Sequence, residues 1–210
     1  LNELAGDDRE LRLRFAQDLK FGTAGLRGLL GAGTNRMNLC TVGWITAGIA
    51  KYMLQNRLDR RGVVIGRDSR LYSRDFAEYA ARVFAGLGVR VYLFDDIRPT
   101  AEVSFAVRTF GAAFGVNVTA SHNPKDYNGY KVYGADGVQI TEEMAAKITE
   151  SAGGDMIAPV CLCDLAPAMD VGLVELIGPE LDEAYLRAVE ACAVMPAPRG
   201  KNACKIVYTP

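Results

Sequence analysis

The sequence lacks the features that two common classes of protein need. Its 24 Lys and Arg residues are balanced by 25 Asp and Glu residues, and the formal net charge is −1. That balance gives no basic excess of the kind that attracts nucleic acid. No apolar run approaches the length of a membrane span, and no signal peptide opens the chain. We therefore expect a cytoplasmic protein that has neither a nucleic-acid partner nor a membrane partner.

The cysteines and the histidine give little support for a metal site or for thiol chemistry. The five cysteines are irregularly spaced, and only Cys161 and Cys163 lie close enough to suggest half of a metal site. No second pair of Cys or His residues completes such a site. Reduced thiols are the simpler interpretation, and they suit a cytosolic protein. The single histidine, His122, confines any imidazole chemistry to one place.

Several familiar catalytic motifs are absent as well. The sequence has neither a Walker A loop nor a GxGxxG fingerprint, which argues against nucleotide binding. It has no GxSxG elbow, and the only histidine directly follows the candidate nucleophile, so a hydrolase triad fits poorly. Half of the residues are apolar and 23% are charged, as in a packed globular domain. With 210 residues, the chain is long enough for one full α/β domain or slightly more.

Apolar runs that suit buried strands alternate with helical patterns along the chain. This alternation predicts βαβ units and a largely parallel sheet. We expect strands at residues 63–66, 89–94, 112–118, 129–133 and 138–140, and one strand with flanking loops within the glycine-punctuated segment from Phe21 to Gly33. We expect helices with an apolar face at Leu11, Phe15 and Leu19, helices beginning near Asn38, Ser73, Pro99 and Thr141, and one at 181–189. The pattern is weak from Ser151 to Gly178.

Both ends of the chain predict an excised domain. The sequence begins at Leu1, close to a helix, and it stops in an apolar stretch, 205–210, that is typical of a strand. We expect residues 1–200 to form one α/β domain. Residues 201–210 would then be a linker and the truncated first strand of a second domain.

The most informative segment follows the apolar run that ends at Val118. It contains Ser121, His122 and Lys131 within eleven positions. In α/β proteins, chemistry is carried by loops at the carboxyl ends of such strands. A serine hydroxyl becomes a nucleophile beside a base or an aligned phosphoryl donor, so Ser121 is a candidate nucleophile. A turn serine that bonds the backbone is the alternative, and Lys131 could be an ordinary exposed lysine.

Two other loops carry arginines that could bind an anion. Arg27 lies in a glycine-flanked segment, where the absence of side chains on the glycines lets an anion approach the backbone. The run from Arg67 to Arg70, which contains Asp68, directly follows a predicted strand. An ion pair that stabilises the turn is an equally good interpretation of this run. Because the ends of parallel strands share one edge, we expect these loops to meet the serine loop there.

Three motifs together resemble the first domain of the α-D-phosphohexomutases, which include phosphoglucomutases and phosphomannomutases. They are Phe-Gly-Thr-Ala-Gly-Leu-Arg-Gly at 21–28, Gly-Arg-Asp-Ser-Arg at 66–70 and Thr-Ala-Ser-His-Asn-Pro at 119–124, the last followed by Asn-Gly-Tyr-Lys-Val at 128–132. The run at 32–38 is similar to the long phosphoglucomutase/phosphopentomutase branch. The resemblance implies a three-layer α/β/α fold with a mostly parallel mixed sheet.

The resemblance also implies an isomerase with a phosphoserine mechanism. Ser121 would donate its phosphoryl group to a hexose or pentose phosphate and recover the other phosphate from a sugar bisphosphate, and a sugar 1,6-bisphosphate would act as activator. Arg27, His122 and Lys131 would assist. Candidate phosphate- or substrate-binding residues are Thr23, Arg67, Asp68, Arg70 and Asn123, although Asn123 could be scaffold alone.

Mg²⁺ is the cofactor that the resemblance implies. A phosphate oxygen on Ser121 would be one ligand, and the others would come from an aspartate loop that is not in this chain. The sugar-binding and distal phosphate-binding parts of the family are also missing, so the missing domains of the same polypeptide are expected partners. We therefore expect the chain by itself to be nearly inactive.

Two other functions stay open at this point. One is a sugar-phosphate-binding or regulatory module in which Ser121 never carries phosphate. The other is a serine-dependent sugar phosphatase, which would release inorganic phosphate instead of interconverting isomers.

Overall fold

The computed structural model describes residues 6–23, 25–194, 205 and 207. The helices are α1 (Asp8–Phe15), α2 (Leu39–Gln55), α3 (Ser73–Gly86), α4 (Thr100–Phe110), α5 (Glu142–Ala152), α6 (Leu165–Asp170) and α7 (Pro179–Ala191). The strands are β1 (Leu26–Leu29), β2 (Val63–Arg67), β3 (Val91–Phe94), β4 (Phe114–Val118), β5 (Tyr127–Gly134) and β6 (Val174–Ile177). The expected linker and strand at 201–210 lie outside the described residues, apart from Lys205 and Val207.

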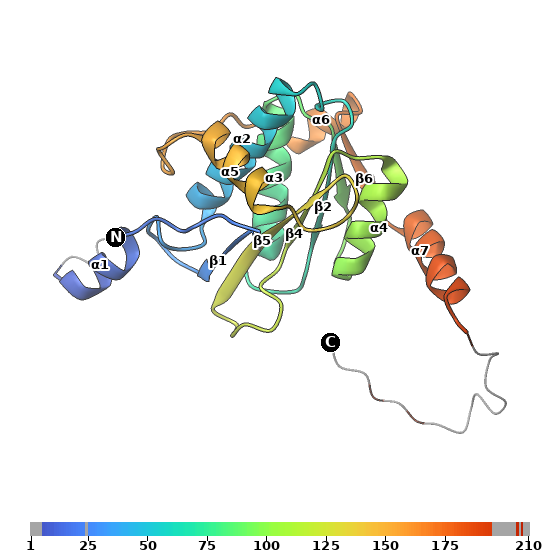
Figure 1. Cartoon of the computed structure of the whole chain (residues 1–210), viewed down its shortest axis with the longest axis horizontal. Helices are drawn as coiled ribbons and strands as arrows, with labels where there is room; N and C mark the ends of the chain where they lie inside the picture. Colours follow the sequence, from blue (N-terminus) through green and yellow to red (C-terminus); the bar gives the residue numbers. More distant parts are fainter. Residues whose placement is uncertain (1–5, 24, 195–204, 206, 208–210) are drawn as a thin grey trace.

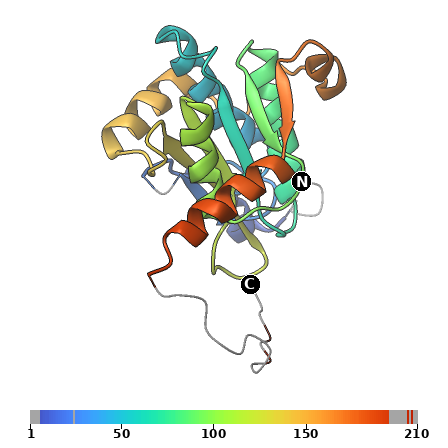
Figure 2. The same cartoon turned by 90° about the vertical axis from the view of Figure 1, so that its right-hand side faces the viewer.

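The described strands form one mixed sheet in the order β1-β5-β4-β2-β3-β6. The pairs β4–β2, β2–β3 and β3–β6 are parallel, whereas β5 runs antiparallel to both β1 and β4. Helices α2, α3 and α5 cover one face of the sheet, and α4 and α7 cover the other (Figures 1 and 2). The architecture is therefore the three-layer α/β/α fold with a mostly parallel mixed sheet that the sequence predicted.

Each face of the sheet has its own apolar core. Along β2, Val63 and Ile65 pack into the core beneath α2, α3 and α5, whereas Val64 packs into the core beneath α4 and α7. Successive residues of a strand point to opposite faces, so a strand covered on both sides must be apolar throughout. This is why β2 and β4 could be recognised from largely apolar runs, although Asn117 interrupts the run in β4.

The N-terminal third of the fold corrects two expectations. Helix α1 ends at Phe15, because the chain then turns so that the Leu19 N–H donates to the Thr34 carbonyl at 2.8 Å. Leu19 is buried from that extended segment, and no residue of α1 is buried. Ser73 begins α3 but does not cap it. The cap position is held by Tyr72, and the Ser73 hydroxyl donates to Asp68 instead.

Two strands also differ from the prediction. β5 begins at Tyr127, two residues early, because its first residues pair with β1. The strand expected at 138–140 is reduced to one isolated bridge between Tyr133 and Gln139. β6 lies inside the stretch whose pattern is weak, and it is an edge strand of the described sheet on which Leu176 is 54% exposed. No described helix has the length and apolar character needed to cross a membrane.

A cluster of charged side chains joins the start of α4 to α7. The Arg98 guanidinium donates to the Asp182 carboxylate at 2.6 Å and to Asp95 at 3.1 Å. Glu102, in the first turn of α4, is 3% exposed. Burial raises the pKa of Glu102 to about 7, and a hydrogen bond with Asp182 and the charge of Asp182 act in the same direction, against the opposing charge of Arg98.

This raised pKa predicts a pH-dependent stability. The unfolded chain ionises Glu102 near pH 4.5, whereas the folded chain holds its proton up to about pH 7. The folded state is therefore favoured at low pH, and this contribution is lost as the pH rises through about 7. Urea unfolding at pH 5 and pH 8 should show that wild type loses more stability than Glu102→Gln over this range. Glu150→Gln, at an exposed position of α5, should behave as wild type; equal losses in wild type and Glu102→Gln would contradict the assignment.

Candidate active site

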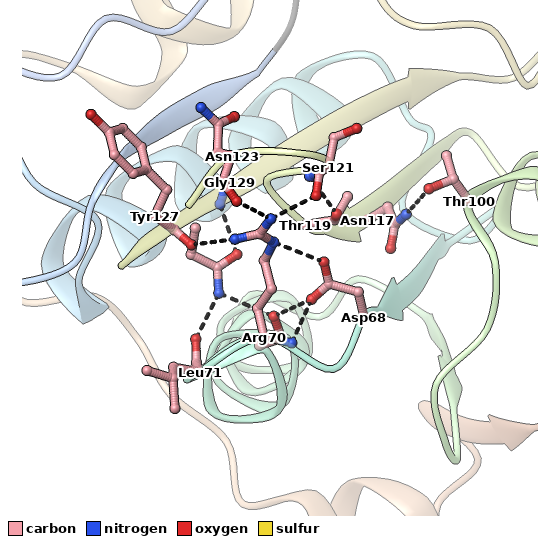
Figure 3. Close-up of polar contacts among 12 residues, drawn as sticks. Asp68, Arg70, Leu71, Thr100, Asn117, Thr119, Ser121, Asn123, Tyr127 and Gly129 are labelled. Carbon is pink, nitrogen blue, oxygen red and sulfur yellow. Dashed lines mark hydrogen bonds and ion pairs between the residues drawn. The ribbon is translucent and has the colours of Figure 1, made fainter. Parts of the chain in front are cut away.

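The loop that carries Ser121 connects the end of β4 to the start of β5. Ser121 has a left-handed backbone with φ 55°, and its side chain is exposed. Its N–H donates to the Thr119 hydroxyl at 3.0 Å. A left-handed backbone costs a residue other than glycine about 1–2 kcal/mol, so contacts of the surrounding loop must hold this conformation. The conformation directs the hydroxyl away from the body of the loop (Figure 3).

The guanidinium of Arg70 fills the inside of the same loop. Its Nη1 donates to the carbonyls of Pro124 at 2.8 Å and Tyr127 at 3.2 Å. Its Nη2 donates to the carbonyls of Ser121 at 2.6 Å and Asn123 (Figure 3). Arg70 was a candidate substrate ligand, and the structure places its charged end against the backbone of the serine loop.

A second set of hydrogen bonds holds Arg70 in place. Asp68 lies 3.5 Å from the Arg70 Nε and accepts from the Arg70 N–H and from the Ser73 hydroxyl, at 3.0 and 2.7 Å. The buried Asn128 amide donates to the same hydroxyl at 3.0 Å and to the Leu71 carbonyl at 2.9 Å. Asp68 therefore connects β2, α3 and the serine loop.

Arg27 and Lys131 lie on one face of the sheet near the serine loop. Arg27 is paired with Gly129 and Lys131 with Asn117, and residues paired across antiparallel strands point to the same side. Burial lowers the pKa of Lys131, the positive charge of Arg27 lowers it further, and Asp68 opposes the shift. Neither cation forms an ion pair with a carboxylate among the described residues. Two neighbouring cations of this kind favour binding of an anion.

The remaining predicted site residues are Arg67, Thr23, His122 and Asn123. Arg67 forms an ion pair with the exposed Asp96 at 3.2 Å, outside its own run, whereas the ion pair within the run joins Arg70 to Asp68. Thr23 and His122 are exposed, and Asn123 is half-buried within the serine loop. The Oδ1 of Asn123 has no hydrogen-bond partner among the described residues. The roles of these residues in binding stay predictions.

Two buried polar residues near the start of the loop were not among the predicted site residues. Thr119 is buried and accepts from Ser121, and Asn117 is 1% exposed and donates to the Thr100 hydroxyl at 2.8 Å. A usable signal was present, because Asn117 interrupts an otherwise apolar buried strand. Asn128 is a turn former by residue type, yet it lies in β5, where its side-chain amide donates to the Ser73 hydroxyl of α3.

A metal ion finds no complete set of ligands here. Among residues 6–23, 25–194, 205 and 207, no group of three or more His, Cys, Asp and Glu side chains could hold one. The exposed Ser121 hydroxyl can accept a phosphoryl group, and Arg27 and Lys131 supply positive charge near it. The arrangement therefore suits transfer of a phosphoryl group more than hydrolysis by a triad.

Comparison with known proteins gives consistent results. The family described as phosphoglucomutase/phosphomannomutase, alpha/beta/alpha domain I, matches residues 18–155. A phosphoglucomutase of Staphylococcus epidermidis is 47% identical over 131 residues, which are 62% of this chain and 24% of that protein. A phosphoglucomutase of Staphylococcus aureus strain USA300 is 44% identical over 149 residues, 70% of this chain and 27% of that protein. The chain spans about a quarter of the length of the curated relatives it matches.

Solved structures agree with this result. A crystal structure described as a phosphomannomutase from Thermus thermophilus has a TM-score of 0.70 and 30% identity, and the match covers 83% of this chain and 36% of that one. A phosphoglucomutase from Paramecium, called parafusin, has a TM-score of 0.64 at 16% identity, over 84% of this chain and 35% of that one. The second likeness shows the fold alone.

The electrostatics of Lys131 can be tested directly. Arg27→Gln should raise the pKa of Lys131, because it removes a like charge, whereas Asp68→Asn should lower it. The measurement is a pH titration of the Lys131 side-chain resonances by NMR. Arg74→Gln, at an exposed position of α3, should leave the titration unchanged. A titration that is insensitive to Arg27→Gln would show that the two cations are not neighbours in solution.

Proposed function

The chain belongs to the phosphoglucomutase/phosphomannomutase family, and on that premise we propose that it is the phosphoserine domain of a phosphosugar mutase. The enzyme is an isomerase that moves a phosphoryl group between the 1- and 6-positions of a hexose phosphate, or the 1- and 5-positions of a pentose phosphate. Residues 1–200 form this domain, and residues 201–210 lead into the next. The other domains of the polypeptide supply the sugar-binding parts of the site.

Ser121 carries the transferred group in this proposal. The bond between phosphorus and the serine oxygen breaks as a sugar hydroxyl attacks, and the proton of that hydroxyl passes to a base. The resulting bisphosphate reorients, and its other phosphoryl group returns to the serine oxygen as the phosphorus–sugar bond breaks. Lys131 with its lowered pKa and the adjacent His122 are the candidates that hold or move these protons. Arg27 stabilises the negative charge on the phosphoryl group.

One observation supports this proposal most strongly. The Ser121 hydroxyl is exposed on a constrained loop, and two cations that lack carboxylate partners among the described residues lie on the neighbouring strands. A serine that only stabilised a turn would need neither the exposure nor the positive charge. Phosphoryl transfer depends on both, because positioning and charge stabilisation supply most of its catalysis.

Mg²⁺ is the proposed cofactor and a sugar 1,6-bisphosphate the proposed activator. The described residues do not form a Mg²⁺ site by themselves, since no group of three or more of their His, Cys, Asp and Glu side chains could hold a metal ion. The phosphate on Ser121 would contribute one oxygen, and the remaining ligands would come from other domains. When bound, the ion would neutralise charge on the phosphoryl group.

The decisive test maps phosphate on the parent polypeptide. After incubation with glucose 1,6-bisphosphate and Mg²⁺, mass spectrometry should find phosphate on Ser121, and glucose 6-phosphate should remove it. Ser121→Ala should carry none and lose turnover. An unmodified Ser121 in a folded parent would favour the binding or regulatory module. Release of stoichiometric inorganic phosphate without isomer interconversion would favour the phosphatase.

The purified 210-residue chain should show no mutase turnover. It contains the phosphoserine but not the proposed sugar-binding parts, so substrate would not be positioned for transfer. A coupled assay of glucose 1-phosphate conversion, with the parent polypeptide as positive control, measures this. Turnover by the chain alone would contradict the proposal that other domains are required.

A further inference from the structure

We propose that Arg70 is a positioning residue, which holds the Ser121 loop in its reactive conformation and does not itself bind substrate. The inference deepens the proposed function of Ser121 and rests on it. The Arg70 guanidinium donates to four backbone carbonyls of the serine loop and also faces the Asp68 carboxylate.

The guanidinium has no nitrogen left for a substrate. Nη1 and Nη2 each serve two backbone carbonyls of the serine loop, and Nε faces the Asp68 carboxylate at 3.5 Å. The side chain is only 14% exposed. A phosphate could reach Arg70 only by displacing carbonyls of the loop that carries the nucleophile. The contacts therefore favour a structural partner over the substrate ligand that the sequence suggested.

The four carbonyl groups explain why a guanidinium is needed. Their oxygens carry partial negative charge and converge from Ser121, Asn123, Pro124 and Tyr127 on one point. Neutral donors would leave these dipoles facing one another, whereas a planar cation with donors in a fixed fork can satisfy all four. A lysine ammonium has three donors on a flexible stem and cannot reproduce this geometry.

The same contacts set the electrostatics around the serine hydroxyl. In a trans peptide the C=O and N–H bonds point in opposite directions. Carbonyls of Ser121 and Pro124 that face Arg70 therefore turn the N–H groups of His122 and Lys125 away from it. The side chain of Ser121 also points away from Arg70 (Figure 3). A phosphoryl group on Ser121 would then lie away from the partial negative charge of the carbonyl oxygens. It would therefore escape their repulsion.

Arg70 also acts on the left-handed conformation of Ser121. The Ser121 carbonyl is held by Arg70 and its N–H by the Thr119 hydroxyl, so both polar groups of this residue's backbone are fixed. Removing the Arg70 bond would free the loop to relax towards ordinary backbone angles. The hydroxyl would remain exposed but would lose its fixed direction.

The kinetic test compares Arg70→Lys and Arg70→Gln with Arg74→Gln in the parent polypeptide. Arg74 is a matched control, because it lies four residues on in α3 and is 73% exposed. Both Arg70 variants should lower kcat for glucose 1-phosphate about 100-fold, the effect of a misplaced reacting group, with KM changed less than about threefold. Arg74→Gln should match wild type. A raised KM with kcat unchanged would make Arg70 a substrate ligand and contradict the proposal. Full activity of Arg70→Lys would also contradict it, because positive charge alone would then suffice.

A second measurement does not depend on catalysis. Hydrogen exchange of the 210-residue chain should be faster at residues 119–128 in both Arg70 variants and unchanged in Arg74→Gln. Unchanged exchange there would overturn the positioning role even if wild type is a mutase. If wild type never phosphorylates Ser121, the proposed function fails, and the exchange data still decide whether Arg70 holds the loop. If Arg70→Gln does not fold, Arg70→Lys, which keeps the charge, gives the deciding comparison.

Discussion

A chain that leaves a strand buried on both faces must find partners for its backbone within a few residues. β4 is such a strand, and in the loop that follows it one side chain, that of Arg70, donates to four of the backbone carbonyls. The Arg70 guanidinium donates hydrogen bonds to carbonyls of the loop. Asp68, Ser73 and Asn128 fix the position of that arginine. In our proposal, the direction of the Ser121 hydroxyl depends on this arrangement.

The site separates two uses of positive charge. Arg70 donates to carbonyl oxygens and has the Asp68 carboxylate beside it, so its positive charge is compensated by groups of the protein. Arg27 and Lys131 instead lie close enough for one to lower the pKa of the other. The first cation stabilises the loop, and the other two leave positive charge available to a phosphate. An arginine near a nucleophile therefore cannot be assigned to substrate from its position in the sequence alone.

Much of the fold could be predicted because the sheet is covered on both sides. Largely apolar runs marked β2 and β4, and the residue type of Asn38 marked it as a helix cap. β6 was missed because it has only four residues and Glu175 interrupts its apolar pattern. β5 was predicted to begin too late because Asn128 is a turn former by propensity, and pairing with β1 overrides that preference. The sequence indicated that Ser121, Arg27 and Lys131 share one edge of the sheet. It could not indicate the partners of Arg70, because contacts with backbone carbonyls impose no residue type on the partner.

The edge strand β6 also matters for practical work with this domain. Its outer side has no partner strand among the described residues, and Leu176 is half exposed there. Open apolar edges recruit other extended chains and cause aggregation. Two features limit this hazard: the strand is only four residues long, and Glu175 forms an ion pair with Arg90 at 3.0 Å. Protein engineering for solubility should therefore keep Glu175 and Arg90 and replace Leu176 with a charged residue.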